Sequence, residues 1–189
     1  MKRIWAPWRM EYIEQLAKGN KKKSQSREAC VFCKAQKGKP SPKNLVLYKG
    51  ETCFVIMNKY PYINGHLMVI PFRHLSDYSK LTLEEHCEMG ILMDLSMRVL
   101  KKVCKAQAFN LGMNLGEVAG AGIREHLHYH IVPRWSGDHN YIPVVADLRV
   151  IMEHLGKTHQ KLIGEFDRCA KKYQPLSSGC SCDGSCDCS

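Results

Sequence analysis

The strongest constraint on the fold is a short segment in which three histidines, His126, His128 and His130, alternate with apolar residues. A period of two is typical of a β-strand, on which the three imidazoles would share one face of a sheet while Leu127 and Tyr129 face a core. Histidine can be neutral near pH 7 and act as a nucleophile or a metal ligand. The segment is therefore a candidate functional site, although a half-exposed strand that merely carries histidines would show the same pattern.

Four further runs have the composition of strands. Residues 45–49 and 52–58 are separated by Gly50, which is typical of a hairpin, and residues 66–71 and 108–115 follow. With the histidine segment they predict about five strands. Helical patterns cover residues 82–103 and 147–173, the second interrupted at Gly156. The mixture predicts an α+β domain.

The first helical pattern begins with a possible capping box, Thr82-Leu-Glu-Glu85. Apolar residues then recur four apart and form a stripe: Cys87, Ile91, Leu95, Val99 and Val103. The methionines at 89, 93 and 97 broaden this stripe. We expect it to pack in the core and across a dimer rather than to form a cofactor surface.

The excess of positive charge lies in the first fifty residues, which hold 13 Lys and Arg but only 3 Asp and Glu, whereas the whole chain carries a net charge of +10. Such a block could steer anionic nucleotides or contact nucleic acid. Residues 18–27, however, contain no apolar side chain and favour a solvated linker. We therefore do not expect nucleic-acid binding.

The length of 189 residues fits one domain with appendages. We expect an arm and basic linker over residues 1–28, the domain over 29–145, a helical region over 146–175 and a Cys-rich, disordered tail over 176–189. No apolar run is long enough to cross a bilayer, and no apolar stretch follows the early positive charges. These features predict no membrane contact and a cytoplasmic location.

The ten cysteines fall into three groups. Cys30 and Cys33 form a C-x-x-C pair that can point two thiolates at one ion, and tetrahedral zinc would need two more ligands. A redox dithiol or two idle cysteines would fit this spacing as well. Four cysteines crowd the tail, where a soft metal is an alternative to plain disorder. The remaining ones stand singly and are interpreted as small core or surface residues.

In these features the chain resembles the histidine triad family, whose signature is His-x-His-x-His followed by two apolar residues. The resemblance extends from about Ala29 to Asn140. Its anchors are Cys30-x-x-Cys33, Asn58-Lys-Tyr-Pro-Tyr-Ile-Asn-Gly-His66, Val69-Ile-Pro-Phe-Arg-His74, Asn114-Leu-Gly116 and the triad. Within the family, Tyr60-Pro-Tyr62 and Pro133-Arg-Trp-Ser-Gly-Asp138 are most similar to the bacterial diadenosine tetraphosphate phosphorylase-like branch.

The resemblance implies an antiparallel sheet of about five strands with packed helices, and a homodimer. Zinc-bearing members of the family take histidines at the positions of His74 and His126. Together with Cys30 and Cys33 they would form a structural Cys2His2 zinc site that clamps the N-terminal loop to the catalytic strand.

The resemblance also implies the chemistry. His128 would attack the α-phosphorus of a nucleotide and form a covalent nucleotidyl-histidine, while its other ring nitrogen donates to a backbone carbonyl. Asn58 matches the position that binds the ribose hydroxyls, where the family often has aspartate. The positions that line the phosphate pocket are Asn114, the backbone of Gly120, Ala121 and Gly122, and His130.

One position departs from the hydrolytic branches, which carry glutamine four residues before the first triad histidine. Here that position is Gly122, which leaves room for an acceptor larger than water, such as inorganic phosphate. We therefore expect phosphorolysis of an adenine-containing dinucleoside polyphosphate, with diadenosine tetraphosphate and phosphate giving ADP and ATP.

Two other functions stay open: a hydrolase of dinucleoside polyphosphates or nucleoside phosphoramidates, and a nucleotide-binding regulatory protein with little turnover. His130 disfavours the sugar-phosphate uridylyltransferase branch, which has glutamine there.

Overall fold

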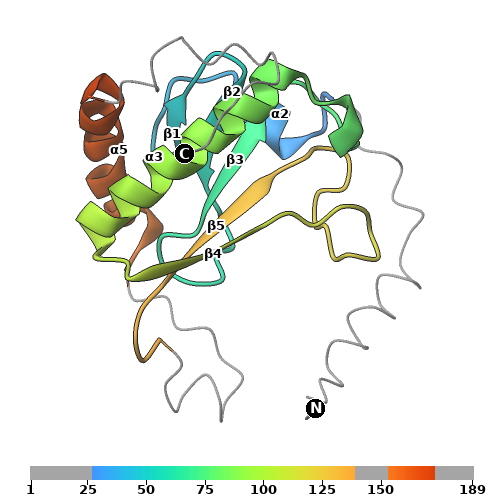
Figure 1. Ribbon diagram of the computed structural model, residues 1–189. Coiled ribbons are helices and arrows are strands. Elements are labelled where there is room, and N and C mark those ends of the chain that lie inside the picture. Colours follow the sequence, from blue (N-terminus) through green and yellow to red (C-terminus); the bar gives the residue numbers. More distant parts are fainter. Residues whose placement is uncertain (1–26, 139–152, 173–189) are drawn as a thin grey trace, which may run out of the picture.

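The computed structural model describes residues 27–138 and 153–172 (Figure 1). The expected N-terminal arm, nearly all of the basic linker and the Cys-rich tail lie outside these residues. The described elements are α2 (Val31–Ala35), β1 (Val46–Lys49), β2 (Cys53–Met57), β3 (Leu67–Pro71), the 3-10 turn η1 (Tyr78–Lys80), α3 (Leu83–Cys104), β4 (Ala108–Gly112), β5 (Tyr129–Arg134) and α5 (Leu155–Lys172).

The five strands form one antiparallel sheet in the order β1-β2-β3-β5-β4, which confirms the predicted α+β class. The last of the described strands, β5, thus lies between β3 and β4. On β5, His130 pairs with Met68 of β3 on one side and with Gly112 of β4 on the other. The segment of the three histidines, residues 126–130, therefore enters the sheet between β4, the described strand that precedes it, and β3, which is far from it in sequence.

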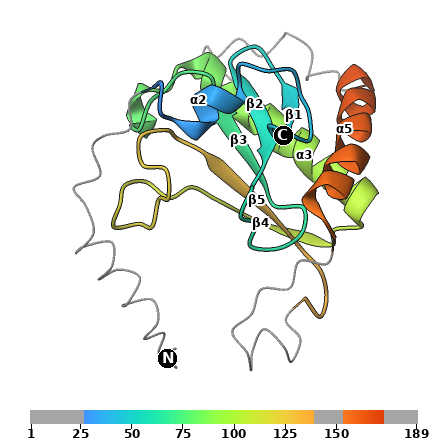
Figure 2. The same ribbon diagram turned by 180° about the vertical axis from the view of Figure 1, so that it is seen from behind.

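Each face of the sheet is covered by helices (Figures 1 and 2). The long helix α3 crosses one face, and the short helix α2 lies on the other. Every residue of β2 is buried, because its side chains alternate between the two faces. Cys53, Val55 and Met57 pack under α3, and Phe54 and Ile56 belong to a second cluster with α2.

Helix α3 begins as predicted, because the Thr82 side chain accepts the Glu85 N–H and the Glu85 side chain accepts the Thr82 N–H. The expected apolar stripe is only partly correct. Leu95 and Val99 are buried, but Cys87 is exposed. Residues four apart advance by more than one turn, so a long four-residue repeat rotates off the buried face at its ends. The buried face is instead made by Met89, Leu92, Leu95, Ser96, Val99 and Leu100.

The two edges of the sheet differ. Helix α5 packs beside β1 and α3, and the ring of His159 donates from Nε2 to the Val46 carbonyl at 2.8 Å. This helix begins one residue before Gly156, where we predicted the interruption. At the other edge, no element among the described residues pairs with the outer side of β4, and Leu111 is 43% exposed. None of the described helices is both long and apolar enough to span a membrane.

Candidate active site and metal centre

The triad segment is not one continuous strand. β5 begins at Tyr129, so His130 lies in the sheet while His126 and His128 lie in the irregular stretch directly before it. The pairing with β3 ends at Val69, and the Leu127 N–H donates instead to the Leu75 carbonyl at 2.8 Å. The predicted alternation nevertheless holds, because Leu127 is in the core under α3 whereas the three histidine rings lie toward α2.

Cys30, Cys33, His74 and His126 converge on the α2 side of the sheet, with one ligand atom from each within 4.8 Å of all the others. His126 Nδ1 lies 3.4 Å from Cys30 Sγ and 3.5 Å from Cys33 Sγ, and His74 Nδ1 lies 3.4 Å from Cys33 Sγ. Ligands bound to zinc at about 2.0 and 2.3 Å with tetrahedral angles lie roughly 3.5 Å apart. Three of the donor separations therefore match a tetrahedral Cys2His2 site, and the remaining ones are within 4.8 Å.

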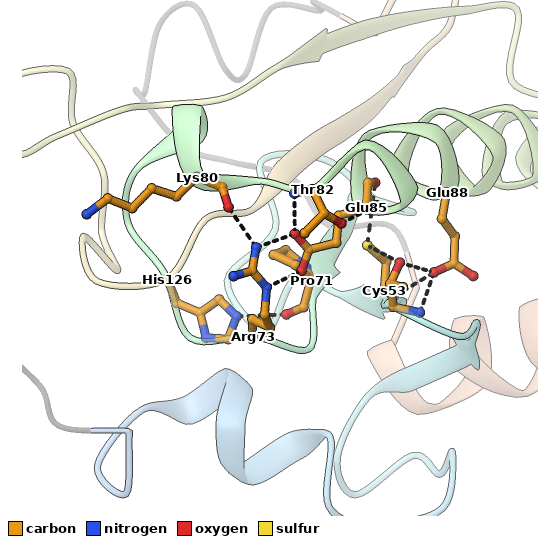
Figure 3. A network of polar contacts seen from close by, with 9 residues as sticks. Cys53, Pro71, Arg73, Lys80, Thr82, Glu85, Glu88 and His126 are labelled. Carbon is orange, nitrogen blue, oxygen red and sulfur yellow. Dashed lines mark hydrogen bonds and ion pairs between the residues drawn. The ribbon is translucent and has the colours of Figure 1, made fainter. Parts of the chain in front are cut away.

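Local structure prepares each donor for a cation. Cys30 is the N-cap of α2 and Cys33 lies in its first turn, so both thiols point to the same side. Burial, with the neighbouring Cys30 as a second cause, raises the pKa of the Cys33 thiol, so the thiolate form needs a cation beside it. His126 Nε2 donates to the Pro71 carbonyl at 2.9 Å, which leaves Nδ1 for an ion (Figure 3). Two thiols and two imidazoles suit zinc.

His128 is buried, and its ring is hydrogen-bonded through Nδ1, whereas that of His126 is hydrogen-bonded through Nε2. Nδ1 donates to the His126 carbonyl at 2.9 Å, as expected for an imidazole kept in one tautomer, and the lone pair is then on Nε2. Burial lowers the pKa of His128, although the hydrogen bond to the carbonyl opposes the shift. The Phe32 ring of α2 packs against the imidazole, with ring centroids 5.2 Å apart. The result is a neutral, oriented imidazole with Nε2 available as a nucleophile.

His130 is oriented by a second histidine on β3's N-terminal side, His66. The backbone N–H of Tyr62 donates to His66 Nδ1 at 3.2 Å, so Nδ1 is an acceptor and the ring proton is on Nε2. His66 Nε2 lies 2.9 Å from His130 Nδ1 and donates to it. Burial, with the charge of His128 as a smaller cause, lowers the pKa of His130 to about 4. A neutral His130 therefore carries its own proton on Nε2, where it can donate to an anionic ligand.

The two asparagines follow strands that lead to the triad. Asn58 comes directly after β2, its side-chain oxygen accepts the Tyr60 N–H at 2.9 Å, and its amide nitrogen lies 3.3 Å from His66 Nδ1. Asn114 is two residues beyond Gly112, the β4 residue paired with His130, and is half-buried. Asn58 thus lies beside His66, and Asn114 follows the strand residue that is paired with His130.

The glycine-rich loop lies directly before the triad, but two of its amides are already used. The N–H groups of Gly120 and Ala121 donate to the carbonyls of Glu117 and Gly116 at 2.9 and 3.3 Å. Binding of phosphate by these amides therefore requires the loop to rearrange. Gly120 has φ +85°, which favours glycine, whereas nothing lies within 4 Å of a Cβ placed on Gly122. Gly122 is exposed, and a side chain at this position would project into open space.

Phe32 and His66 were not predicted as site residues. Phe32 lies inside the C-x-x-C pair and contacts the rings of both His126 and His128. His66 begins the predicted strand 66–71, and an antiparallel pairing of that strand with the triad strand would have indicated its contact with His130. The order of strands that makes this pairing could not be deduced from the chain alone.

Comparisons with known proteins identify the family of the chain. The HIT domain family model matches residues 39–137. The AP-4-A phosphorylase of Mycobacterium tuberculosis is 36% identical over 168 residues, covering 89% of this chain and 86% of that protein. The bis(5'-adenosyl)-triphosphatase of Saccharomyces cerevisiae is 32% identical over 92 residues, covering 48% of this chain and 44% of that protein.

A solved structure of a Zn-bound histidine triad family protein from Mycobacterium smegmatis superimposes with a TM-score of 0.63 at 23% identity, covering 78% of this chain and all of that one. The likeness in structure supports the fold, and the match in sequence extends over the triad. The chain belongs to the HIT domain family and is similar to enzymes that act on adenosine-containing dinucleotides.

Proposed function

We propose that the protein is a dinucleoside polyphosphate phosphorylase that works through a nucleotidyl-histidine on His128. His128 Nε2 attacks the α-phosphorus of diadenosine tetraphosphate, the bond to the bridging oxygen breaks, and ATP leaves. Inorganic phosphate then attacks the adenylyl group on His128, which releases ADP and restores the imidazole. The observation that carries the proposal is the tautomer of His128, whose Nδ1 is held by the His126 carbonyl so that Nε2 has the lone pair.

The neighbouring groups have matching roles. The Nε2–H of His130 donates to an oxygen of the reacting phosphate, where negative charge increases as the fifth bond forms. Asn114 is a second donor at this pocket, and Asn58 binds the ribose hydroxyls. The loop of Gly120, Ala121 and Gly122 contributes amides after its turn opens, because two of them are bonded within the loop in this structure.

Phosphate as the acceptor is supported by Gly122. Its backbone does not require glycine and a Cβ there would meet nothing within 4 Å, so a larger residue would be tolerated by the fold. Its missing side chain provides space for a tetrahedral anion beside the triad. The M. tuberculosis relative named as a phosphorylase supports the same reaction.

The reaction is tested by incubating the full chain with diadenosine tetraphosphate, with and without inorganic phosphate, and identifying the products by mass. The proposal predicts ADP and ATP only when phosphate is present. AMP with ATP, or two ADP, formed in water would show a hydrolase instead, the alternative supported by the similarity to the yeast triphosphatase. Tight AMP binding that survives His128→Ala, without turnover in the unsubstituted protein, would indicate a nucleotide-binding regulator.

We further propose that the Cys2His2 cluster holds one structural zinc ion. Cys30 and Cys33 supply thiolates, and His74 and His126 supply neutral imidazoles. Burial lowers the pKa of His126 to about 4, so this ring needs no deprotonation to bind the ion. The role of the ion is to join α2 to the triad segment, and no step of the reaction passes through it.

We also propose a homodimer formed along β4. The outer edge of this strand pairs with no described element, and the three apolar side chains Leu111, Leu115 and Val118 are 43%, 48% and fully exposed. A second copy would satisfy the free backbone groups and cover these side chains. Light scattering after size exclusion should give the mass of two chains, and the mass of one chain at micromolar concentration would refute the dimer.

A further inference from the structure

Residues 71–75 connect both metal-site histidines to the sheet. The Pro71 carbonyl accepts the Nε2–H of His126 at 2.9 Å, and His74 lies within the segment. The Leu75 carbonyl accepts the Leu127 N–H at 2.8 Å. The position of this segment therefore sets where both imidazoles of the cluster lie.

Arg73, in the middle of the segment, joins it to the first turn of α3 (Figure 3). Its Nε donates to one carboxylate oxygen of Glu85 at 2.7 Å and its Nη2 to the other at 2.6 Å. Nη2 also donates to the Lys80 carbonyl at 2.7 Å. Two parallel bonds between guanidinium and carboxylate fix direction as well as distance.

Glu85 is buried for a reason beyond helix capping. Its side chain is 3% exposed, while that of Arg73 is 52% exposed. The cap itself needs only the bond from the Thr82 N–H to Glu85, at 2.9 Å. The hydrogen bond from Arg73 lowers the pKa of Glu85, so the carboxylate is charged at neutral pH. The additional pair with Arg73 thus joins the cap of α3 to the segment that carries His74.

We propose that Glu85, acting through Arg73, is a positioning residue for the metal centre: it holds residues 71–75 so that His74 and His126 meet the two thiolates. This inference rests on the zinc site proposed above. Outer groups that orient metal ligands change metal affinity by about 10- to 100-fold when they are removed. Glu85 acts one step further out, through the backbone, so we expect the lower end of that range.

The same helix provides a matched control in Glu88. Its carboxylate accepts the N–H groups of Glu51, Thr52 and Cys53 at 2.7, 2.6 and 2.8 Å and the Thr52 hydroxyl at 2.5 Å. Glu88 therefore binds the turn between β1 and β2 (Figure 3). It reaches residues 71–75 only through the backbone, because the Phe72 N–H donates to the Thr52 carbonyl at 2.8 Å and Cys53 pairs with Pro71. Glu85→Gln and Glu88→Gln each weaken a well-bonded carboxylate of α3, but only Glu85 binds a side chain of the metal-bearing segment, that of Arg73.

The experiment uses the zinc-loaded full chain and measures zinc release into a chromogenic chelator for the unsubstituted protein, Glu85→Gln, Glu88→Gln and Arg73→Ala. We expect release about tenfold faster for Glu85→Gln and Arg73→Ala, and changed by less than twofold for Glu88→Gln. The double variant Arg73→Ala/Glu85→Gln should release zinc no faster than either single variant, because the two residues act as one unit. Cobalt-loaded samples should show an altered tetrahedral ligand-field spectrum for the first two variants alone.

Arg73→Ala keeps the experiment decisive if Glu85→Gln folds poorly, because the Arg73 side chain is half exposed. Equal release from Glu85→Gln, Arg73→Ala and Glu88→Gln, in a protein that binds one zinc ion, would overturn the positioning role while leaving the metal site in place. An unsubstituted protein that binds no zinc or cobalt would overturn the metal site and this inference with it.

Discussion

His126 and His128 lie two residues apart on one face of the same segment, yet backbone carbonyls hold opposite ring nitrogens of the two imidazoles. His126 donates from Nε2 to Pro71, and its Nδ1 faces the thiols. His128 donates from Nδ1 to the carbonyl of His126, and its Nε2 keeps the lone pair. The difference shows that two residues of one motif need not be equivalent: the carbonyl bonded to each ring leaves Nδ1 available in His126 and Nε2 available in His128, which matches the metal-ligand and nucleophile roles that we propose.

The largest expected effect comes from removing the nucleophile alone. His128→Asn should lower kcat by at least about 10³-fold, because no other group can form the covalent intermediate. Zinc content should stay at the unsubstituted value, since His126 is intact. Initial rates with diadenosine tetraphosphate and metal analysis of the same sample check both statements, and activity within tenfold of the unsubstituted protein would remove His128 from this role.

The converse substitution is Cys30→Ser, which should abolish binding of one zinc equivalent. We expect a loss of at least about 3 kcal/mol in the free energy of unfolding, because metal binding and folding are coupled at such sites. Urea unfolding and metal analysis measure the two effects. Cys87→Ser, at an exposed position of α3, is the control and should change neither. Unaltered metal content in Cys30→Ser would contradict the division between the two histidines.

A smaller effect is expected from a substitution at His66, which should affect catalysis without affecting metal binding. His66→Asn removes the donor that fixes His130, and we expect kcat to fall roughly five- to tenfold, the cost of about one hydrogen bond in the transition state. Zinc content should not change, because the described contact of His66 with the triad is with His130, which is not one of the four proposed metal ligands. Loss of zinc from this variant would show that the two halves depend on each other.

The smallest expected effect is on pH dependence. Burial lowers the pKa of His130 to about 4, below its usual value of 6.5, so the folded ring stays neutral while the unfolded ring takes up a proton. His130 thus contributes stability above pH 6.5 that is lost as the pH falls toward 4. Urea midpoints at a series of pH values should show this acid-side slope reduced in His130→Asn. Identical slopes in the two proteins would contradict the lowered pKa.

Much of the sheet could be predicted because its central strands are apolar throughout or alternate with period two. The stripe on α3 shows the limit: a spacing of four predicted Cys87 inside, and the rotation of the helix places it outside. Strand order was a further limit. The contact between His66 and His130 depends on β5 lying beside β3, a pairing between residues far apart in the sequence.

The metal site too could be predicted only in part from local sequence patterns. The spacing of Cys30 and Cys33 indicated a metal, but Cys33 lies 41 residues from His74 and 93 from His126, so no local pattern could join them. The resemblance to the histidine triad family supplied these two residues. Neither spacing nor resemblance indicated that the loop amides of Gly120 and Ala121 would be bonded within the loop itself.

The most direct test of the central claim is a long-range 1H–15N spectrum of the zinc-loaded protein labelled at histidine, recorded near pH 7, with signals assigned from His126→Asn and His128→Asn. The account predicts opposite tautomers: a proton on Nε2 of His126 with Nδ1 bound to metal, and a proton on Nδ1 of His128 with a bare Nε2. The same tautomer for both rings, or a doubly protonated His128, would contradict it.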